Sequence, residues 1–213
     1  MKKVMRFFLP KEKKFFEMLS DQSETALEAS KELGRFVSEY ENTERDERKQ
    51  KIKSLNALKE KNGEAATEIM HKLSKSFRAP IDKEDIALLS FLIYDITRLT
   101  HAVSSRLVIL GIERIDDYSP KLISVANKCI NEVNKSIKNL DRPKGMDGHF
   151  SNMTGIRNEA EKIYDEALSE LFHFYKNSLD IIKYREVYNL IEKMIEKSFE
   201  VSYVIGRVFA KHR

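Results

Sequence analysis

Apolar residues recur every three or four positions along most of the chain, which is the period of an amphipathic α-helix. Short polar segments, or segments containing Gly and Pro, separate these stretches. The pattern predicts an all-α protein. Residues 141–155 hold four Gly and Pro residues and are predicted to form its longest loop. The expected helices cover about 10–40, 44–76, 82–110, 120–140, 156–175 and 180–213.

The stretch 82–110 has the most regular apolar stripe. Its spacing of roughly 3.5 residues is typical of the left-handed packing in helical bundles. Gly111 is a natural residue to follow such a helix at its C-terminus. In the stretch 44–76, by contrast, Gly63 interrupts the apolar stripe, which is expected to continue to Phe77 just past the helix end. Gly costs about 1 kcal/mol relative to Ala in a helix interior, so we expect this helix to be weakest or bent at Gly63.

The joint between the second and third helices is the most informative stretch of the sequence. Pro80 disfavours the α conformation at the residue before it, so the second helix should end there. Asp82 is expected to begin the third helix by accepting a hydrogen bond from the N–H of Asp85, and Asp85 to reciprocate. Acidic residues in the first turn also suit the helix dipole. We therefore predict a tight joint between long antiparallel helices, made by Phe77, Pro80, Asp82, Glu84 and Asp85.

Three helices, a link at 112–119 and three more helices suggest an internal repeat. We therefore expect six long helices forming two three-helix bundles side by side, with Pro120 at the first position of the fourth helix. The expected division is residues 1–111 and 112–213, packed as one compact unit. A chain of 213 residues is long enough to bury a sizeable core.

Composition narrows the class of protein. The net charge of +4 arises from 38 basic and 34 acidic residues, which indicates a mixed, solvated surface and no nucleic-acid partner. Cys129 is the only cysteine, so an intrachain disulfide and a multi-thiolate metal site are excluded, and a cytoplasmic location is the default. No window reaches the roughly 18 uncharged apolar residues that a membrane span needs.

Motifs for catalysis are missing from the sequence. It contains no G-x-S-x-G, no Walker-type glycine loop and no H-E-x-x-H, and its five histidines are scattered. We therefore expect a protein that is not an enzyme.

Paired carboxylates are the remaining candidate chemistry. Glu192 and Glu196 lie four residues apart, so they share one helix face and could hold a cation together. The alternative is a solvated face on which Lys193 and Lys197 balance the two acids.

The joint also carries a family resemblance. The pattern Phe77-x-x-Pro80-x-Asp82-Lys83-Glu84-Asp85-Ile86 resembles the hallmark of the PhoU-like proteins encoded beside Pit-type inorganic phosphate transporters, in which Arg usually replaces Lys83. Residues 7–19 resemble the N-terminus of that family, and residues 156–209 are similar to it in helix order and spacing. The resemblance implies two PhoU-like three-helix bundles and a cytosolic, non-enzymatic accessory or regulator of inorganic phosphate transport.

The family's repeated Glu-x-x-x-Asp motifs are associated with divalent or iron-type metal ions, so the resemblance also implies candidate ligands. Without a gap, the first motif falls on Lys59 and Gly63. In the third helix Tyr94 and Arg98 accompany one remaining acid, and Arg157 takes an acidic position in the fifth. An Arg there would replace the charge of a metal ion instead of recruiting one, so the absence of metal is the alternative. The candidate metal ligands are Glu60, Glu64, Asp95, Glu161, Glu192 and Glu196.

Several functions remain open at this point. The leading hypothesis is reversible docking on the cytoplasmic face of a Pit-type transporter, with a location peripheral to the inner membrane. Phe7, Phe8, Phe15 and Phe16 around a Lys cluster could form a docking foot, or could pack the first helix onto the bundle. The alternatives are a protein that stores or senses metal ions, and a helical scaffold for homo-oligomers.

Overall fold

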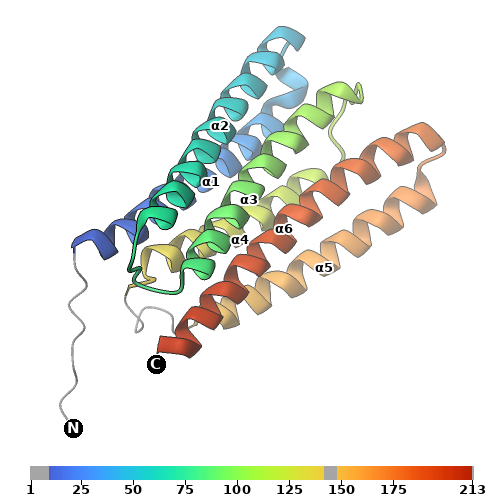
Figure 1. The fold of residues 1–213 in the computed structure, drawn as a ribbon. Helices are drawn as coiled ribbons and strands as arrows, with labels where there is room; N and C mark the ends of the chain where they lie inside the picture. Colours follow the sequence, from blue (N-terminus) through green and yellow to red (C-terminus); the bar gives the residue numbers. More distant parts are fainter. Residues whose placement is uncertain (1–9, 142–147, 213) are drawn as a thin grey trace.

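The computed structural model describes residues 10–141 and 148–212, and the described residues form long helices without a strand (Figure 1). A short 3-10 helix, η1 (Tyr40–Asn42), follows the first helix. The all-α prediction is therefore confirmed. The helices are α1 (Pro10–Glu39), α2 (Arg45–Lys75), α3 (Lys83–Ile109), α4 (Ser119–Lys138), α5 (His149–Phe174) and α6 (Ser178–His212).

The helices run side by side as long rods, with α1–α3 forming one bundle and α4–α6 the other (Figure 1). α2 packs against α1 and α3, and α5 packs against α4 and α6. α1 and α3 in turn pack against α4 and α6, respectively. The two bundles thus meet along four inner helices, while α2 and α5 lie at the outside. The division into domains at residue 111 stays a prediction.

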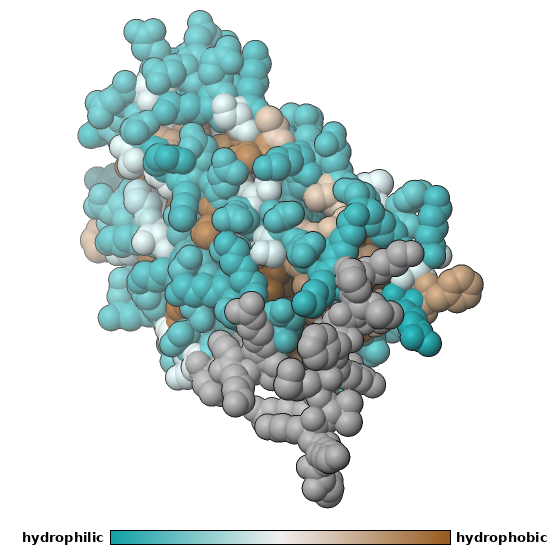
Figure 2. Space-filling view, turned by 90° about the vertical axis from the view of Figure 1, so that its left-hand side faces the viewer, coloured by the Kyte–Doolittle hydropathy of each residue, from teal (hydrophilic) through white to brown (hydrophobic). Residues whose placement is uncertain are grey.

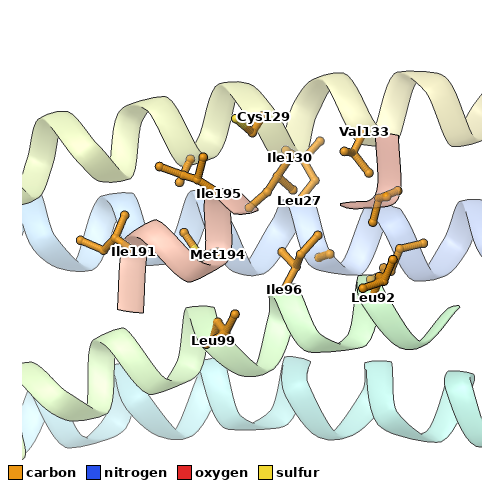
Figure 3. Packing of buried hydrophobic residues seen from close by; sticks show 14 of the residues in the cluster. Leu27, Leu92, Ile96, Leu99, Cys129, Ile130, Val133, Ile191, Met194 and Ile195 are labelled. Carbon is orange, nitrogen blue, oxygen red and sulfur yellow. The ribbon is translucent and has the colours of Figure 1, made fainter. Parts of the chain in front are cut away.

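A single hydrophobic core joins the two bundles. Leu27 of α1, Ile96 of α3, Ile130 of α4 and Met194 of α6 point into the same space between the helices (Figure 3). Each of these side chains is at least nine-tenths buried. Because burial of a Leu or Ile side chain contributes about 1.5–3 kcal/mol, this shared layer strongly couples the two halves.

α3 is the central helix of this core. The residues of its predicted stripe from Ile86 to Leu107 are all buried, and Gly111 adopts the left-handed conformation (φ 60°) expected after a helix. Among the described helices, α3 alone has the length and composition of a membrane span, but 61% of the window that qualifies is buried inside the protein. Its apolar character is explained by its central place in the bundle.

The joint ends α2 and starts α3 as predicted, but the acids at the joint act differently. The Asp82 side chain makes no capping hydrogen bond, and the N–H of Asp85 donates to the backbone oxygen of Asp82 at 3.0 Å. The buried Asp85 carboxylate instead accepts hydrogen bonds from Arg207 and from Lys211, whose Nζ lies 3.2 Å away. Lys211 also contacts Asp82 Oδ2 at 2.7 Å. The predicted capping box is therefore wrong, and these acids attach the joint to the last turns of α6.

The prediction for Phe77, also at the joint, is wrong as well. It was expected to extend the buried stripe of α2, but it is fully exposed. α2 ends at Lys75, and Ser76 already has extended backbone angles (φ −92°, ψ 131°). The helical period therefore cannot continue to Phe77.

The second half also differs from the prediction in its loops. α5 begins at His149 and not at 156, so much of the predicted loop is helix. Gly148, with φ 93°, precedes this helix, and Gly155 lies inside it. His149 explains the early start, because its buried ring lies 2.6 Å from Ser136 Oγ of α4 and also bonds Ser202 Oγ of α6.

α4 begins one residue before Pro120, which is therefore not its first residue. Asp116 stabilises the start of α4. Its Oδ1 accepts hydrogen bonds from the N–H groups of Tyr118 and Ser119 at 2.8 and 2.9 Å. The hydroxyl of Tyr188 on α6 donates to the same oxygen at 2.7 Å, so this helix start is joined to the core.

Candidate functional site: the outer faces of the two helical hairpins

The six candidate acids fall into two groups that lie on different hairpins. Glu161, Glu192 and Glu196 line one cleft of about 350 Å³ between α5 and α6. The remaining three acids, Glu60, Glu64 and Asp95, belong to α2 and α3. The structure therefore does not bring the six residues into one site, and each hairpin has to be considered separately.

The α5–α6 cleft is acidic and partly neutralised. Burial raises the pKa of the Glu192 carboxyl above its usual value, and the nearby charge of Glu196 adds to this effect. Burial, followed by the charge of Glu192, raises the pKa of the Tyr164 hydroxyl to about 12. Arg157 Nε lies 3.4 Å from Glu161 Oε1, and its guanidinium carbon lies 4.8 Å from the centre of the Phe199 ring. Arg157 thus supplies positive charge where the resemblance implied a metal ligand.

This arrangement does not fit a metal centre. Among the described residues, no group of three or more His, Cys, Asp or Glu side chains is placed to hold a metal ion. Ca²⁺ takes about six to eight oxygen ligands, and structural Zn²⁺ about four. We therefore derive no chemistry through a metal ion, and a ligand role for the six acids stays a prediction.

On the α2–α3 hairpin the three candidate acids have different surroundings. Asp95 is buried and its Oδ1 lies 2.7 Å from Arg98 Nε. Glu60 is exposed and accepts a hydrogen bond from Asn56 at 2.7 Å. Glu64 borders an open groove between the two helices.

Gly63 and Tyr94 meet where the resemblance places acidic motif positions. A Cβ atom added at Gly63 would lie 3.1 Å from Cε2 of the Tyr94 ring. α2 continues as a helix through Gly63, so the ring packs closely on a backbone that has no side chain there. This contact gives a reason for a residue that costs about 1 kcal/mol in a helix interior.

The groove beside this contact has a volume of about 1300 Å³. Met70 and Phe91 are 52% and 56% exposed on its walls, and Leu88 is 37% exposed. Sequence reasoning missed the groove, although Leu88 and Phe91 lie outside the predicted core stripe of α3 and could have indicated it. Its other lining residues include Gly63, Glu64, Ala66, Thr67, Glu68, His71, Glu84, Ala87 and Tyr94.

Of the two roles considered for the N-terminal aromatic residues, a docking foot or packing of the first helix onto the bundle, the described part supports packing. Phe15 and Phe16 are buried in the core, so they pack α1 onto the bundle. Phe7 and Phe8 lie outside the described residues. Cys129 is also buried, and burial raises the pKa of its thiol to about 12, so it is not a reactive thiolate at neutral pH.

Comparison with known proteins gives a consistent result, although no family model matches the sequence. A Rhizobium meliloti protein provisionally named a pit accessory protein is 21% identical over 212 residues, covering 96% of each chain. UPF0111 protein YkaA of Bacillus subtilis is 23% identical over 146 residues, covering 68% of this chain and 71% of its own. A PhoU-like protein from Shewanella oneidensis has the same fold, with a TM-score of 0.82 at 14% identity over 92% of this chain and 99% of its own.

A second structure supports the same relationship. It is a Shewanella oneidensis protein provisionally described as a PhoU-like phosphate regulatory protein, with a TM-score of 0.81, 15% identity and the same coverage of 92% and 99%. The predicted resemblance at the joint thus agrees with the relatives found by sequence and by fold. By sequence the chain is therefore similar to a protein provisionally named a pit accessory protein, and it has the fold of the PhoU-like structures.

Proposed function

We propose that this protein is a non-enzymatic accessory or regulator of inorganic phosphate transport that docks reversibly on the cytoplasmic face of a Pit-type transporter. The observation that carries the proposal is the match along 96% of the chain to a relative provisionally named a pit accessory protein. The PhoU-like fold, which extends over 92% of the chain, supports it. The protein would be cytoplasmic and peripheral to the inner membrane while docked.

The use of the polar groups in the core supports a role without catalysis. Asp85, Asp116 and His149 are buried, and each one joins two or more helices. Burial also lowers the pKa of His149. These groups hold the bundle together and are shielded from solvent, so the exposed helix faces are left to carry recognition.

Co-purification tests the proposal directly. A tagged copy of the protein should retain a Pit-type transporter from detergent-solubilised membranes, and part of the protein should sediment with membranes only when the transporter is present. Light scattering on the purified protein would establish whether it docks as a monomer or a homo-oligomer. Equal recovery of the transporter on beads without the protein would contradict the proposal.

A further inference from the structure

We propose that the groove between α2 and α3 holds a basic, amphipathic segment from the cytoplasmic side of the transporter. This inference rests on the proposed function and names the surface and the partner chemistry that it would use. Three observations carry it: the shape, the size and the charge.

The shape is that of two parallel helical stripes. On α2 the lining residues follow a spacing of three and four, through Gly63, Thr67 and Met70. On α3 the same spacing recurs through Leu88 and Phe91. Small residues make room between walls of large apolar side chains, which is the arrangement that receives the apolar face of an amphipathic helix.

The size favours a polypeptide over a small molecule. The groove has a volume of about 1300 Å³. Small-molecule pockets typically enclose about 300–1,000 Å³ and bury most of the ligand. This groove is an open trough along two helices and exposes large side chains on its walls, with Phe91 56% exposed and Met70 52% exposed. Exposed apolar surface of this kind marks interaction sites.

The acidic residues that line the groove favour a basic partner. Glu64, Glu68 and Glu84 line the groove. Glu68 pairs with Lys72, but Glu64 and Glu84 have no ion pair within the described residues. Cytoplasmic loops of membrane proteins carry an excess of Lys and Arg. A basic segment with an apolar face therefore complements both the walls and the acidic residues of the groove.

The test uses synthetic peptides that cover each cytoplasmic loop of the Pit-type transporter. Fluorescence anisotropy with the full chain should find one basic peptide whose dissociation constant rises roughly tenfold or more in Phe91→Ser and in Met70→Ser. The charge reversals Glu64→Lys and Glu84→Lys should weaken binding by a similar factor and reduce its dependence on salt. Phe174→Ser removes a phenyl group that is 69% exposed at the end of α5, and it should leave binding unchanged. Glu28→Lys on α1 is the control for charge reversal.

The outcomes separate this inference from the proposed function. If the wild-type protein retains the intact transporter but the groove variants do so equally well, the proposed function stands and the groove assignment is wrong. If the wild-type protein retains neither transporter nor peptide, both are wrong. If Phe91→Ser converts a dimer into monomers and leaves peptide binding intact, the groove belongs to a second copy of the chain and the inference is overturned.

Discussion

The α2–α3 and α5–α6 hairpins occupy corresponding places in the two bundles, and each presents a hollow to solvent. The α2–α3 hollow has apolar walls, with the Tyr94 ring set against Gly63. The α5–α6 hollow contains Glu161 and Glu192 and is partly neutralised by Arg157. The inner faces of both hairpins are apolar and enter the common core. Figure 3 shows this for α3 and α6.

This comparison indicates that packing constrains the inner faces of the two hairpins but not their outer faces. The face formed by the α1 and α2 side is largely hydrophilic, with small hydrophobic areas between the polar side chains and one hydrophobic group projecting at the right-hand edge (Figure 2). An apolar groove on a largely hydrophilic surface indicates an interaction site for another protein.

The ends of the two hairpins should differ in their contribution to stability. Asp85 attaches the α2–α3 joint to α6 through Arg207 and Lys211. Removing one partner of a buried ion pair typically costs about 3–5 kcal/mol, so Asp85→Ala should lower the free energy of unfolding by about 3 kcal/mol. Asp180→Ala, near the start of α6, should change it by less than about 0.5 kcal/mol. Urea denaturation measures both, and equal losses would contradict the contrast.

Two glycines provide a matched test of the outer faces. Gly63→Val should displace the Tyr94 ring and destabilise the protein by about 1–3 kcal/mol. Gly155→Ala should stabilise it by about 0.5–1 kcal/mol, because the added Cβ would meet no atom within 4 Å beyond its chain neighbours and the adjacent backbone of its own helix, and Ala favours the helix. Thermal unfolding of the two variants tests this, and a stable Gly63→Val protein would show that the Tyr94 contact has little importance.

Much of this fold is predictable from the sequence, because local signals agree with the packing. The apolar stripe of α3 and the break at Pro80 locate two helices and their joint correctly. The Gly63–Tyr94 contact is not predictable, because it depends on which helix lies opposite. His149 is missed for a similar reason, since Gly and Pro around it signal a loop while its partners Ser136 and Ser202 lie on other helices. The candidate site is therefore less predictable than the fold.

The acidic cleft should show a small pH effect. The pKa of Glu192 is raised in the folded protein, so its ionisation opposes folding. This loss of stability is absent below the pKa of the unfolded chain and fully present above the pKa of the folded protein. Glu192→Gln should therefore stabilise the protein at pH 7 by up to about 0.5 kcal/mol, which raises the midpoint temperature of thermal unfolding. Near pH 3 the same substitution should leave this midpoint unchanged. A gain that persists at pH 3 would contradict this account.

The same cleft should lack a tightly held metal ion. Elemental analysis of the purified protein should find less than stoichiometric iron, manganese and zinc, and Glu192→Ala combined with Glu196→Ala should not change the result. This follows because no group of three or more metal-ligating side chains is assembled among the described residues. Stoichiometric metal that disappears in the double variant would instead assign the cleft to metal binding.

Phosphate uptake in whole cells tests the proposed function most directly. Radiolabelled phosphate uptake should be measured over a wide range of external concentrations in cells with the gene, without it, and complemented by the wild-type chain. We predict that loss of the gene changes uptake through the Pit-type transporter and that the wild-type chain restores it. Identical uptake curves in all three strains would contradict a role in phosphate transport.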